Sequence, residues 1–275
     1  MTTHVIYHGH CYDGFTAAWA AYRALGKDAE YIPAKYGDAP PPLPETARVV
    51  IADFSYPRAV LEDLRQRVAS LTILDHHKTA QADLDGFPGA TFDMDHSGAC
   101  LAWRYFHPKT HDPLFVQYIE DRDLWRFKLP HSREISAYIQ SFDYSFLNWD
   151  RFHDEISNSI DGFCRGPVTE GSAILRAKEQ MVKQMAYNVT FQDWDGLRVP
   201  VANAACYFSE VGEQLCIDHP DAKFSAYYFD RRDGKRQWGL RSRGGFDVSA
   251  VAKKRGGGGH PGAAGFVENI VKDVS

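Results

Sequence analysis

The apolar and polar positions in the first third of the chain follow a pattern typical of strands separated by helices. Brief apolar runs, several of them β-branched, predict strands at residues 4–7, 29–33, 48–52, 71–74 and 90–92. Apolar residues at helical spacing predict helices over residues 13–25 and 57–68, and Gly26 ends the first of them. The pattern indicates an α/β fold in which helices flank a mostly parallel sheet.

After residue 96 the pattern becomes helical. Ser97 is a suitable N-cap for an aromatic-rich helix, and Pro113 opens another that extends to about residue 121. We expect residues 133–160 to be helical in pieces and residues 171–187 to form a longer helix. The domain boundary is predicted after this helix, so that the two domains are residues 1–188 and 189–275.

The second predicted domain is a smaller, mixed α/β subdomain. Strands are predicted at residues 197–202, 224–229 and 237–241, and helices at residues 211–217 and 248–254. Asp233-Gly234 is a strong hairpin signal between the last two strands. Four glycines, Gly256 to Gly259, then precede His260-Pro261 and an apolar run. Because glycine allows close backbone approach and positive φ, we expect these four residues to form an ordered loop.

Composition narrows the possible classes of protein. The 275 residues are 44% hydrophobic, enough for one large or two modest cores, and contain no apolar run long enough to span a bilayer. The first residues, Met1 to Val5, lack the basic segment and apolar core of a secretory signal, so we expect none. The five cysteines are scattered, and we expect a cytoplasmic protein with reduced thiols. A net charge of −5 argues against a protein that coats long duplex nucleic acid.

Positive charge is concentrated in one part of the chain. Nine Lys or Arg residues against two Asp lie between Arg231 and Arg255. A local basic face of this kind suits a short polyanionic substrate, and a solvated hairpin is the alternative interpretation.

Polar side chains that could hold metal ions follow three of the predicted strands. These motifs are His8-Gly9-His10-Cys11-Tyr12-Asp13-Gly14, Ala52-Asp53 and Asp75-His76-His77-Lys78. Sites in open α/β sheets lie at the carboxyl ends of strands, so we expect the three motifs to meet there. Asp and neutral His are suitable ligands for Mn²⁺-like or Zn²⁺-like ions.

Two further motifs complete an ordered set. They are Glu120-Asp121-Arg122-Asp123 and Gly256-Gly257-Gly258-Gly259-His260-Pro261-Gly262. Together the five motifs resemble, over nearly the whole chain, the DHH family of phosphoesterases, named for Asp-His-His, with its C-terminal subdomain marked by Gly-Gly-Gly-His. The resemblance implies a metal-binding catalytic domain, a smaller substrate-binding subdomain and a cleft between them.

Phosphodiester hydrolysis requires a hydroxide nucleophile and neutralisation of phosphoryl charge, and two divalent ions about 3.5–4 Å apart provide both. The resemblance implies that Asp53 bridges the two ions. It also implies that His76, Asp13 and an acid of the fourth motif hold one ion, for which we favour Asp121 and keep Asp123 as the rival. His8, Asp53 and one further residue would hold the other ion. The donor types favour Mn²⁺, with Mg²⁺ and Co²⁺ as alternatives.

The first motif departs from the pattern of the family. Cys11 occupies the place of the first of two Asp residues that are usually separated by one residue. It could bind a softer ion as a thiolate, pack without a role, or leave one metal site weaker. The spacing of His8 is also not fixed by the motif, and His10 is an alternative ligand.

The remaining candidate residues act around the ions. We expect Asp75 to orient a histidine, with a strand-end cap as the alternative, and His77 to contact substrate or to donate a proton to the leaving oxygen. The resemblance implies that Gly257, Gly258, Gly259 and His260 bind the far end of the substrate. Arg241 and Arg243 precede that loop, and one of them could bind a phosphate bidentately.

The favoured function is hydrolysis of a phosphodiester by a metal-bound hydroxide. By resemblance, the substrates are short oligonucleotides or linear dinucleotides, cut to mononucleotides as by a nanoRNase. Two alternatives stay open: a phosphoanhydride or phosphomonoester hydrolase acting on nucleotide, bisphosphate or polyphosphate, and a non-catalytic nucleotide-binding protein with a degraded metal site. We expect no membrane partner, and the sequence leaves open whether the chain forms a homodimer.

Overall fold

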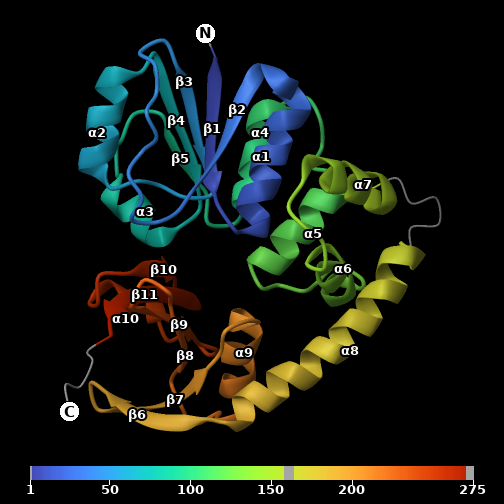
Figure 1. Cartoon of the computed structure of the whole chain (residues 1–275), viewed down its shortest axis with the longest axis vertical. Coiled ribbons are helices and arrows are strands. Elements are labelled where there is room, and N and C mark those ends of the chain that lie inside the picture. Colours follow the sequence, from blue (N-terminus) through green and yellow to red (C-terminus); the bar gives the residue numbers. More distant parts are fainter. Residues whose placement is uncertain (1, 158–163, 271–275) are drawn as a thin grey trace. The chain divides into compact units, whose positions relative to one another are not determined.

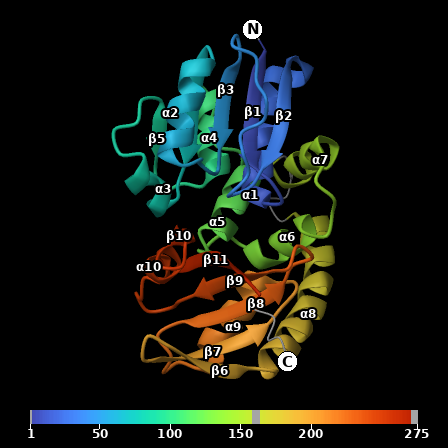
Figure 2. The ribbon, with the colours of Figure 1, turned by 60° about the vertical axis from the view of Figure 1, so that its left-hand side comes forward.

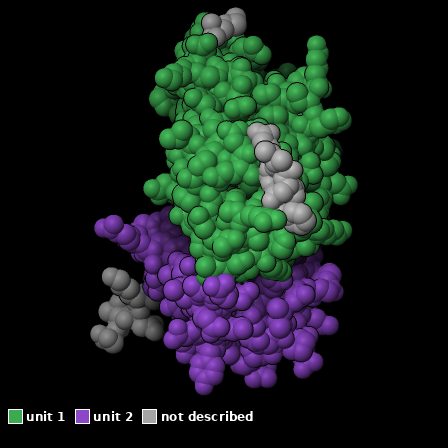
Figure 3. All heavy atoms as spheres, turned by 90° about the vertical axis from the view of Figure 1, so that its right-hand side faces the viewer, with its two compact units in different colours: residues 1–175 green, residues 176–275 purple. Residues whose placement is uncertain are grey.

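The computed structural model describes residues 2–157 and 164–270, which form two compact units, residues 1–175 and 176–275 (Figure 3). The division falls within α8 (Arg165–Tyr187), whereas the boundary predicted from the sequence lies just beyond the end of that helix. Val168, near its start, packs against the core of the first unit, while Val182 and Ala186 belong to a core of the second. One continuous helix therefore contributes to both units.

A five-stranded, wholly parallel sheet in the order β2-β1-β3-β4-β5 organises the first unit (Figure 1). Its strands are β1 (Thr3–His8), β2 (Ala29–Ala34), β3 (Arg48–Ala52), β4 (Ser70–Asp75) and β5 (Ala90–Phe92). Each lies within one residue of the predicted range. The expected parallel α/β sheet is therefore confirmed, and its carboxyl ends share one edge.

Helices cover both faces of this sheet, because neighbouring strand residues point to opposite cores. Val50 and Ala52 face the core that contains α1 (Tyr12–Leu25) and α4 (Gly98–Phe106), whereas Val49 and Ile51 face the core that contains α2 (Arg58–Arg67). The other helical segments of this unit are η1 (Gly26–Asp28), α3 (Lys78–Asp83), α5 (Leu114–Asp123), α6 (Ser132–Ile139) and α7 (Phe146–Ser157).

Local sequence sets the ends of these helices as expected. The Ser97 side chain accepts a hydrogen bond from the backbone N–H of Cys100 at the start of α4, and Gly26 ends α1 with φ of 59°. The aromatic-rich stretch from residue 133 is helical in pieces, as α6 and α7 show, and its residues 158–160 lie outside the described residues. Among the helices that the structure describes, none combines the length and apolar character needed to cross a bilayer.

The second unit contains a six-stranded mixed sheet in the order β10-β11-β9-β8-β7-β6; Figure 2 shows β9, β8, β7 and β6 side by side. Its elements are β6 (Thr190–Trp194), β7 (Leu197–Asn203), α9 (Phe208–Asp218), β8 (Ser225–Asp230), β9 (Lys235–Arg241), α10 (Val248–Lys253), β10 (Gly258–His260) and β11 (Ala263–Asn269). Among the described strands of this sheet, only β7 and β8 pair in parallel. The predicted mixed α/β subdomain is confirmed.

Candidate metal centre

The candidate site lies at the carboxyl edge of the parallel sheet. His8 is the last residue of β1, Asp53 follows β3, and His76 follows β4. Asp13 lies in the first turn of α1, and Asp123 is the last residue of α5. The chain leaves β1 toward β2 on one side and returns to β3 on the other, and ligand sites of open α/β sheets lie at such a reversal of strand order.

Three carboxylates converge on one imidazole nitrogen. The Nε2 atom of His76 lies 3.0 Å from Oδ1 of Asp53, 3.7 Å from Oδ2 of Asp13 and 3.6 Å from Oδ2 of Asp123. The donor atoms of Asp13, His76 and Asp123 all lie within 4.8 Å of one another. This spacing allows a single cation to contact all three.

A second group of donors meets at the other oxygen of Asp53. Its Oδ2 lies 3.3 Å from Nδ1 of His8, and Cys11 joins these two residues in a group whose donor atoms also lie within 4.8 Å of one another. Asp53 therefore turns one carboxylate oxygen toward each group, the arrangement that a bridging ligand requires. Its φ of 63° lies in the left-handed region, which Asp adopts more readily than most residues.

The site concentrates negative charge away from water. Burial and the charges of Asp53 and Asp123 raise the pKa of Asp13 well above its usual value. The pKa of Asp123 is also raised, mainly by burial and also by the charge of Asp53. Burial would also raise the pKa of Asp53, but its hydrogen bond with His76 and the proximity of His8 hold it well below the usual range. A bound cation would relieve this repulsion.

His76 itself brings positive charge into this cluster of carboxylates. Burial lowers its pKa, but the hydrogen bond with Asp53 and the three nearby carboxylates raise it to about 10. The imidazole is therefore protonated at neutral pH. Binding a metal through Nε2 would displace that proton, so the affinity of the site for cations should rise with pH.

The donor set fits a divalent cation. The Oδ2 atoms of Asp13 and Asp53 are buried and accept no hydrogen bond of ordinary geometry from any described residue. Buried carboxylate oxygens without a partner are costly, and a cation satisfies them. Oxygen donors with one imidazole suit Mn²⁺-like ions.

The thiol of Cys11 is disfavoured in its charged form by its surroundings. Burial and the carboxylates of Asp53, Asp123 and Asp13 raise the pKa of the Cys11 thiol well above its usual value.

Asp75 orients His77 and not the ring of His76. Its Oδ1 accepts hydrogen bonds from the backbone N–H groups of His76 and His77, at 2.7 and 3.3 Å, and lies 2.7 Å from Nδ1 of His77. Its Oδ2 accepts a hydrogen bond of 2.6 Å from Oγ of Ser55. Burial lowers the pKa of His77, but Asp75 raises it above its ordinary value.

Asp121 lies outside the cluster, although the sequence favoured it over Asp123. Its carboxylate accepts hydrogen bonds from the backbone N–H groups of Lys128 and Leu129, at 2.9 and 3.1 Å. Its carbonyl oxygen accepts two more, from Arg126 and Phe127. Successive residues of a helix are about 100° apart around the axis, so side chains two positions apart face different ways. Asp121 faces the segment after α5, and Asp123 faces His76.

The two acids should respond differently to replacement by asparagine. Asp121→Asn turns an amide NH₂ toward a backbone N–H and is expected to lower the free energy of unfolding by about 1–3 kcal/mol. Asp123→Asn removes a carboxylate that repels Asp13 and Asp53, so we expect unchanged or higher stability and weaker Mn²⁺ binding. Urea unfolding in EDTA and calorimetric Mn²⁺ titration measure the two effects. A destabilised Asp123→Asn with intact Mn²⁺ binding would reverse the assignment.

Gly98 and Tyr36 lie next to the cluster, although no motif in the sequence predicts that they do. A Cβ at Gly98 would lie 2.5 Å from Cβ of Asp53 and 2.9 Å from Oδ2 of Asp13, so the start of α4 packs directly against both acids. Tyr36 is 54% exposed as a residue, and the centroid of its ring lies 5.4 Å from that of the His8 ring and 5.8 Å from that of the His77 ring. His10, the alternative to His8, is exposed and belongs to none of the donor groups found among the described residues.

The predicted substrate residues of the second unit are ordered. Gly258 to His260 form β10. Two positions of the run favour glycine by their backbone geometry, since Gly256 and Gly259 have φ of 79° and 136°. The register across β10, β11 and β9 aligns His260 with Ala263 and Ala263 with Arg241. Arg241 is buried, and Arg243 in the following loop is exposed. The expected order of the glycine run is confirmed, with a strand in place of part of the loop.

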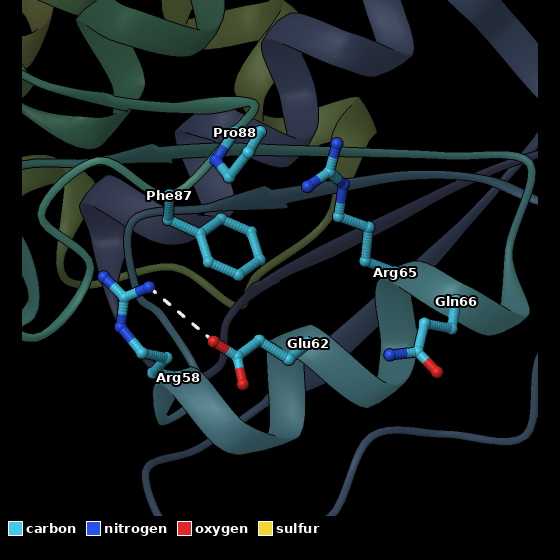
Figure 4. Close-up of a pocket in the computed structure, with 6 residues that line it drawn as sticks. All are labelled: Arg58, Glu62, Arg65, Gln66, Phe87 and Pro88. Carbon is cyan, nitrogen blue, oxygen red and sulfur yellow. Dashed lines mark ion pairs between the residues drawn. The ribbon is translucent and has the colours of Figure 1, made fainter.

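A separate pocket of about 350 Å³ lies on the first unit between α2 and the segment before β5 (Figure 4). It is lined by Arg58, Glu62, Arg65, Gln66, Phe87 and Pro88. None of the predicted site residues lines it, and Arg58 is held by Glu62 at 3.7 Å and by the carbonyl oxygens of Asp83 and Asp85. The pocket is therefore separate from the metal centre.

Comparison with known proteins bears on the fold. No family model matches the chain. The chain is 28% identical over 289 residues to the uncharacterized protein R106 of Acanthamoeba polyphaga mimivirus, covering 98% of this chain and 68% of that protein.

The solved structures that are similar to the chain include two with DHH-type descriptions or phosphodiesterase activity. The DHH domain of a member of the S1p family of ribosomal proteins has a TM-score of 0.64 at 14% identity, covering 97% of this chain and 82% of that one. The pGpG-specific phosphodiesterase PggH from Vibrio cholerae has a TM-score of 0.51 at 16% identity, covering 98% and 94%. The chain has the fold of DHH proteins, as its motifs implied.

Proposed function

We propose that the chain is a metal-dependent phosphoesterase of the DHH family that hydrolyses linear dinucleotides or very short oligonucleotides to mononucleotides. The observation that carries this proposal is the sharing of Asp53 between two groups of metal donors at the carboxyl edge of the sheet. Two adjacent cation positions joined by one carboxylate are the usual basis of hydrolytic phosphoryl transfer.

Each donor has a proposed place in the centre. Asp13, Asp53, His76 and Asp123 would hold one divalent cation, and His8, Cys11 and Asp53 the other. When bound, such a pair activates water and neutralises charge on the phosphoryl group. Mn²⁺ is the favoured ion for the oxygen-rich position.

His77 would donate a proton to the leaving group, and Asp75 would hold His77 in position. The carboxylate of Asp75 fixes the His77 ring through Nδ1 and favours its protonated form. The Nε2–H of the imidazolium can then donate to a phosphoryl oxygen or to the leaving oxygen. Ser55 holds Asp75 in place from the other side.

Two observations support the proposed substrate class. The similar Vibrio cholerae protein is a pGpG-specific phosphodiesterase, and pGpG is a dinucleotide. In this chain, we assign binding of the far part of the substrate to Gly257, Gly258, Gly259 and His260, together with Arg241 or Arg243. A guanidinium and an imidazole on one row of the second sheet suit a terminal phosphate.

The test is turnover of a labelled linear dinucleotide by the purified chain with Mn²⁺. We expect mononucleotides as products, no reaction in EDTA, and recovery when Mn²⁺ is restored in excess. A phosphomonoester and polyphosphate serve as comparison substrates. Turnover of the phosphomonoester or polyphosphate alone would contradict the proposed substrate class. Tight dinucleotide binding without turnover in Mn²⁺, Mg²⁺ or Co²⁺ would contradict the proposal that the chain is an enzyme.

A further inference from the structure

We propose that the two cation positions differ in chemical character, and that the position formed by His8, Cys11 and Asp53 selects a thiophilic cation such as Zn²⁺. This inference rests on the metal centre of the proposed function and adds a preference that separates its two halves. The centre would then be mixed, with a softer ion at one position and a harder ion at the other.

The two donor groups differ in the atoms that they offer. Asp13, His76 and Asp123 provide two carboxylates and one imidazole, whereas His8, Cys11 and Asp53 provide a thiol, an imidazole and a carboxylate. Carboxylate-rich sites suit Mn²⁺ and Mg²⁺, and a thiolate favours Zn²⁺. Three protein ligands of mixed sulfur, nitrogen and oxygen type also match an open zinc site, in which the fourth position remains for water or substrate.

The backbone places the sulfur firmly within this group. Cys11 is the N-cap residue of α1, with extended φ and ψ of −118° and 134°, and its carbonyl oxygen accepts the first hydrogen bond of the helix, from Phe15. His8 reaches the site from the end of β1, three residues earlier, and Asp53 from β3. The side chain is therefore held beside two other ligands by regular structure.

A second cysteine makes the test specific. Cys100 also lies in a group of metal-type donors, with His96 and Glu120. That group is occupied by its own hydrogen bonds, because Glu120 accepts from the backbone N–H of Ser97 and pairs with Arg126, and the Cys100 thiol donates to Asp112. We therefore expect a thiophilic ion to bind through Cys11 and not through Cys100.

The experiment follows Co²⁺ binding to the metal-stripped chain by the near-ultraviolet thiolate-to-cobalt charge-transfer band, which does not depend on hydrolysis. The wild type and Cys100→Ser should show the band, and Cys11→Ser and Cys11→Asp should lack it. Zn²⁺ affinity should fall at least about tenfold in Cys11→Ser, since even a change at a residue that only orients a ligand costs that much. Cys11→Asp should regain affinity for Mn²⁺ at this position.

The outcomes separate this inference from the proposed function. A charge-transfer band in the wild type without hydrolysis would support the inference and contradict the proposed hydrolase function. Hydrolysis without a band, or a band lost in Cys100→Ser and kept in Cys11→Ser, would overturn the inference. If the Cys11 variants do not fold, alkylation of the wild type decides: Zn²⁺ should protect Cys11 from iodoacetamide, mapped by peptide mass spectrometry, and equal labelling with and without Zn²⁺ would refute the inference.

Discussion

Asp53→Asn is expected to remove dinucleotide hydrolysis almost completely. The carboxylate faces both donor groups, at 3.0 Å from His76 and 3.3 Å from His8, so the variant weakens both cation positions at once. If the ions contribute several kcal/mol of charge stabilisation, kcat/KM should fall by about 10³-fold or more. Asparagine keeps the shape of the side chain and tolerates the left-handed backbone, so the fold should survive. Steady-state rates with Mn²⁺ measure the loss.

A matched control separates loss of this carboxylate from loss of any negative charge. Asp63→Asn removes an exposed acid of α2 whose partner is Arg67, at 2.7 Å. Exposed pairs contribute little, so its rate should match that of the wild type. Thermal melting should show both variants folded. A folded Asp53→Asn that hydrolyses at the wild-type rate would disprove the bridging role.

Gly98→Ala is expected to disturb the same centre through backbone packing alone. The new Cβ would lie 2.5 Å from Cβ of Asp53 and 2.8 Å from its Cα, so Asp53 or the start of α4 must move. Alanine favours helix by up to about 1 kcal/mol, but crowding of a packed site costs about 1–3 kcal/mol, and crowding should win. Displacement of a ligand by about 1 Å would also lower kcat/KM by about 10²-fold.

Gly166→Ala is the control for this prediction. Gly166 also lies near the start of a helix, but a Cβ there would meet no described atom within 4 Å. Its stability should be unchanged or slightly higher, and its rate unchanged. Urea unfolding and steady-state kinetics on both variants test the contrast. Equal stability and activity of Gly98→Ala and Gly166→Ala would show that the close approach at Gly98 is not required.

The fold was predictable wherever burial left a pattern in the sequence. The five strands of the first sheet are buried between helices, and their apolar runs located them within one residue. Strand β6 was missed because four of its five residues are exposed, so it lacks both an apolar run and alternation. The start of α8 was placed six residues late, since Gly166 and Pro167 at its beginning are weak helix formers.

The candidate site was predictable only as far as strand ends define it. His8, Asp13, Asp53 and His76 follow or adjoin strands, and parallel pairing brings them together. Asp121 and Asp123 could not be separated, because the choice depends on how α5 is rotated about its axis. Gly98 and Tyr36 were not predictable as parts of the site, since each meets the acids or histidines through tertiary contact between distant segments.

The path of α8 determines how the chain can be dissected into fragments. Val182 and Ala186 pack with Ala202, Val211 and Leu215, so the last turns of this helix are part of a hydrophobic core of the C-terminal half. A recombinant piece that starts at residue 189 would lack Val182 and Ala186, would leave their partners Ala202, Val211 and Leu215 exposed to water, and would be prone to aggregate. Any truncation intended to isolate the glycine-rich half should keep the helix from Arg176 onward.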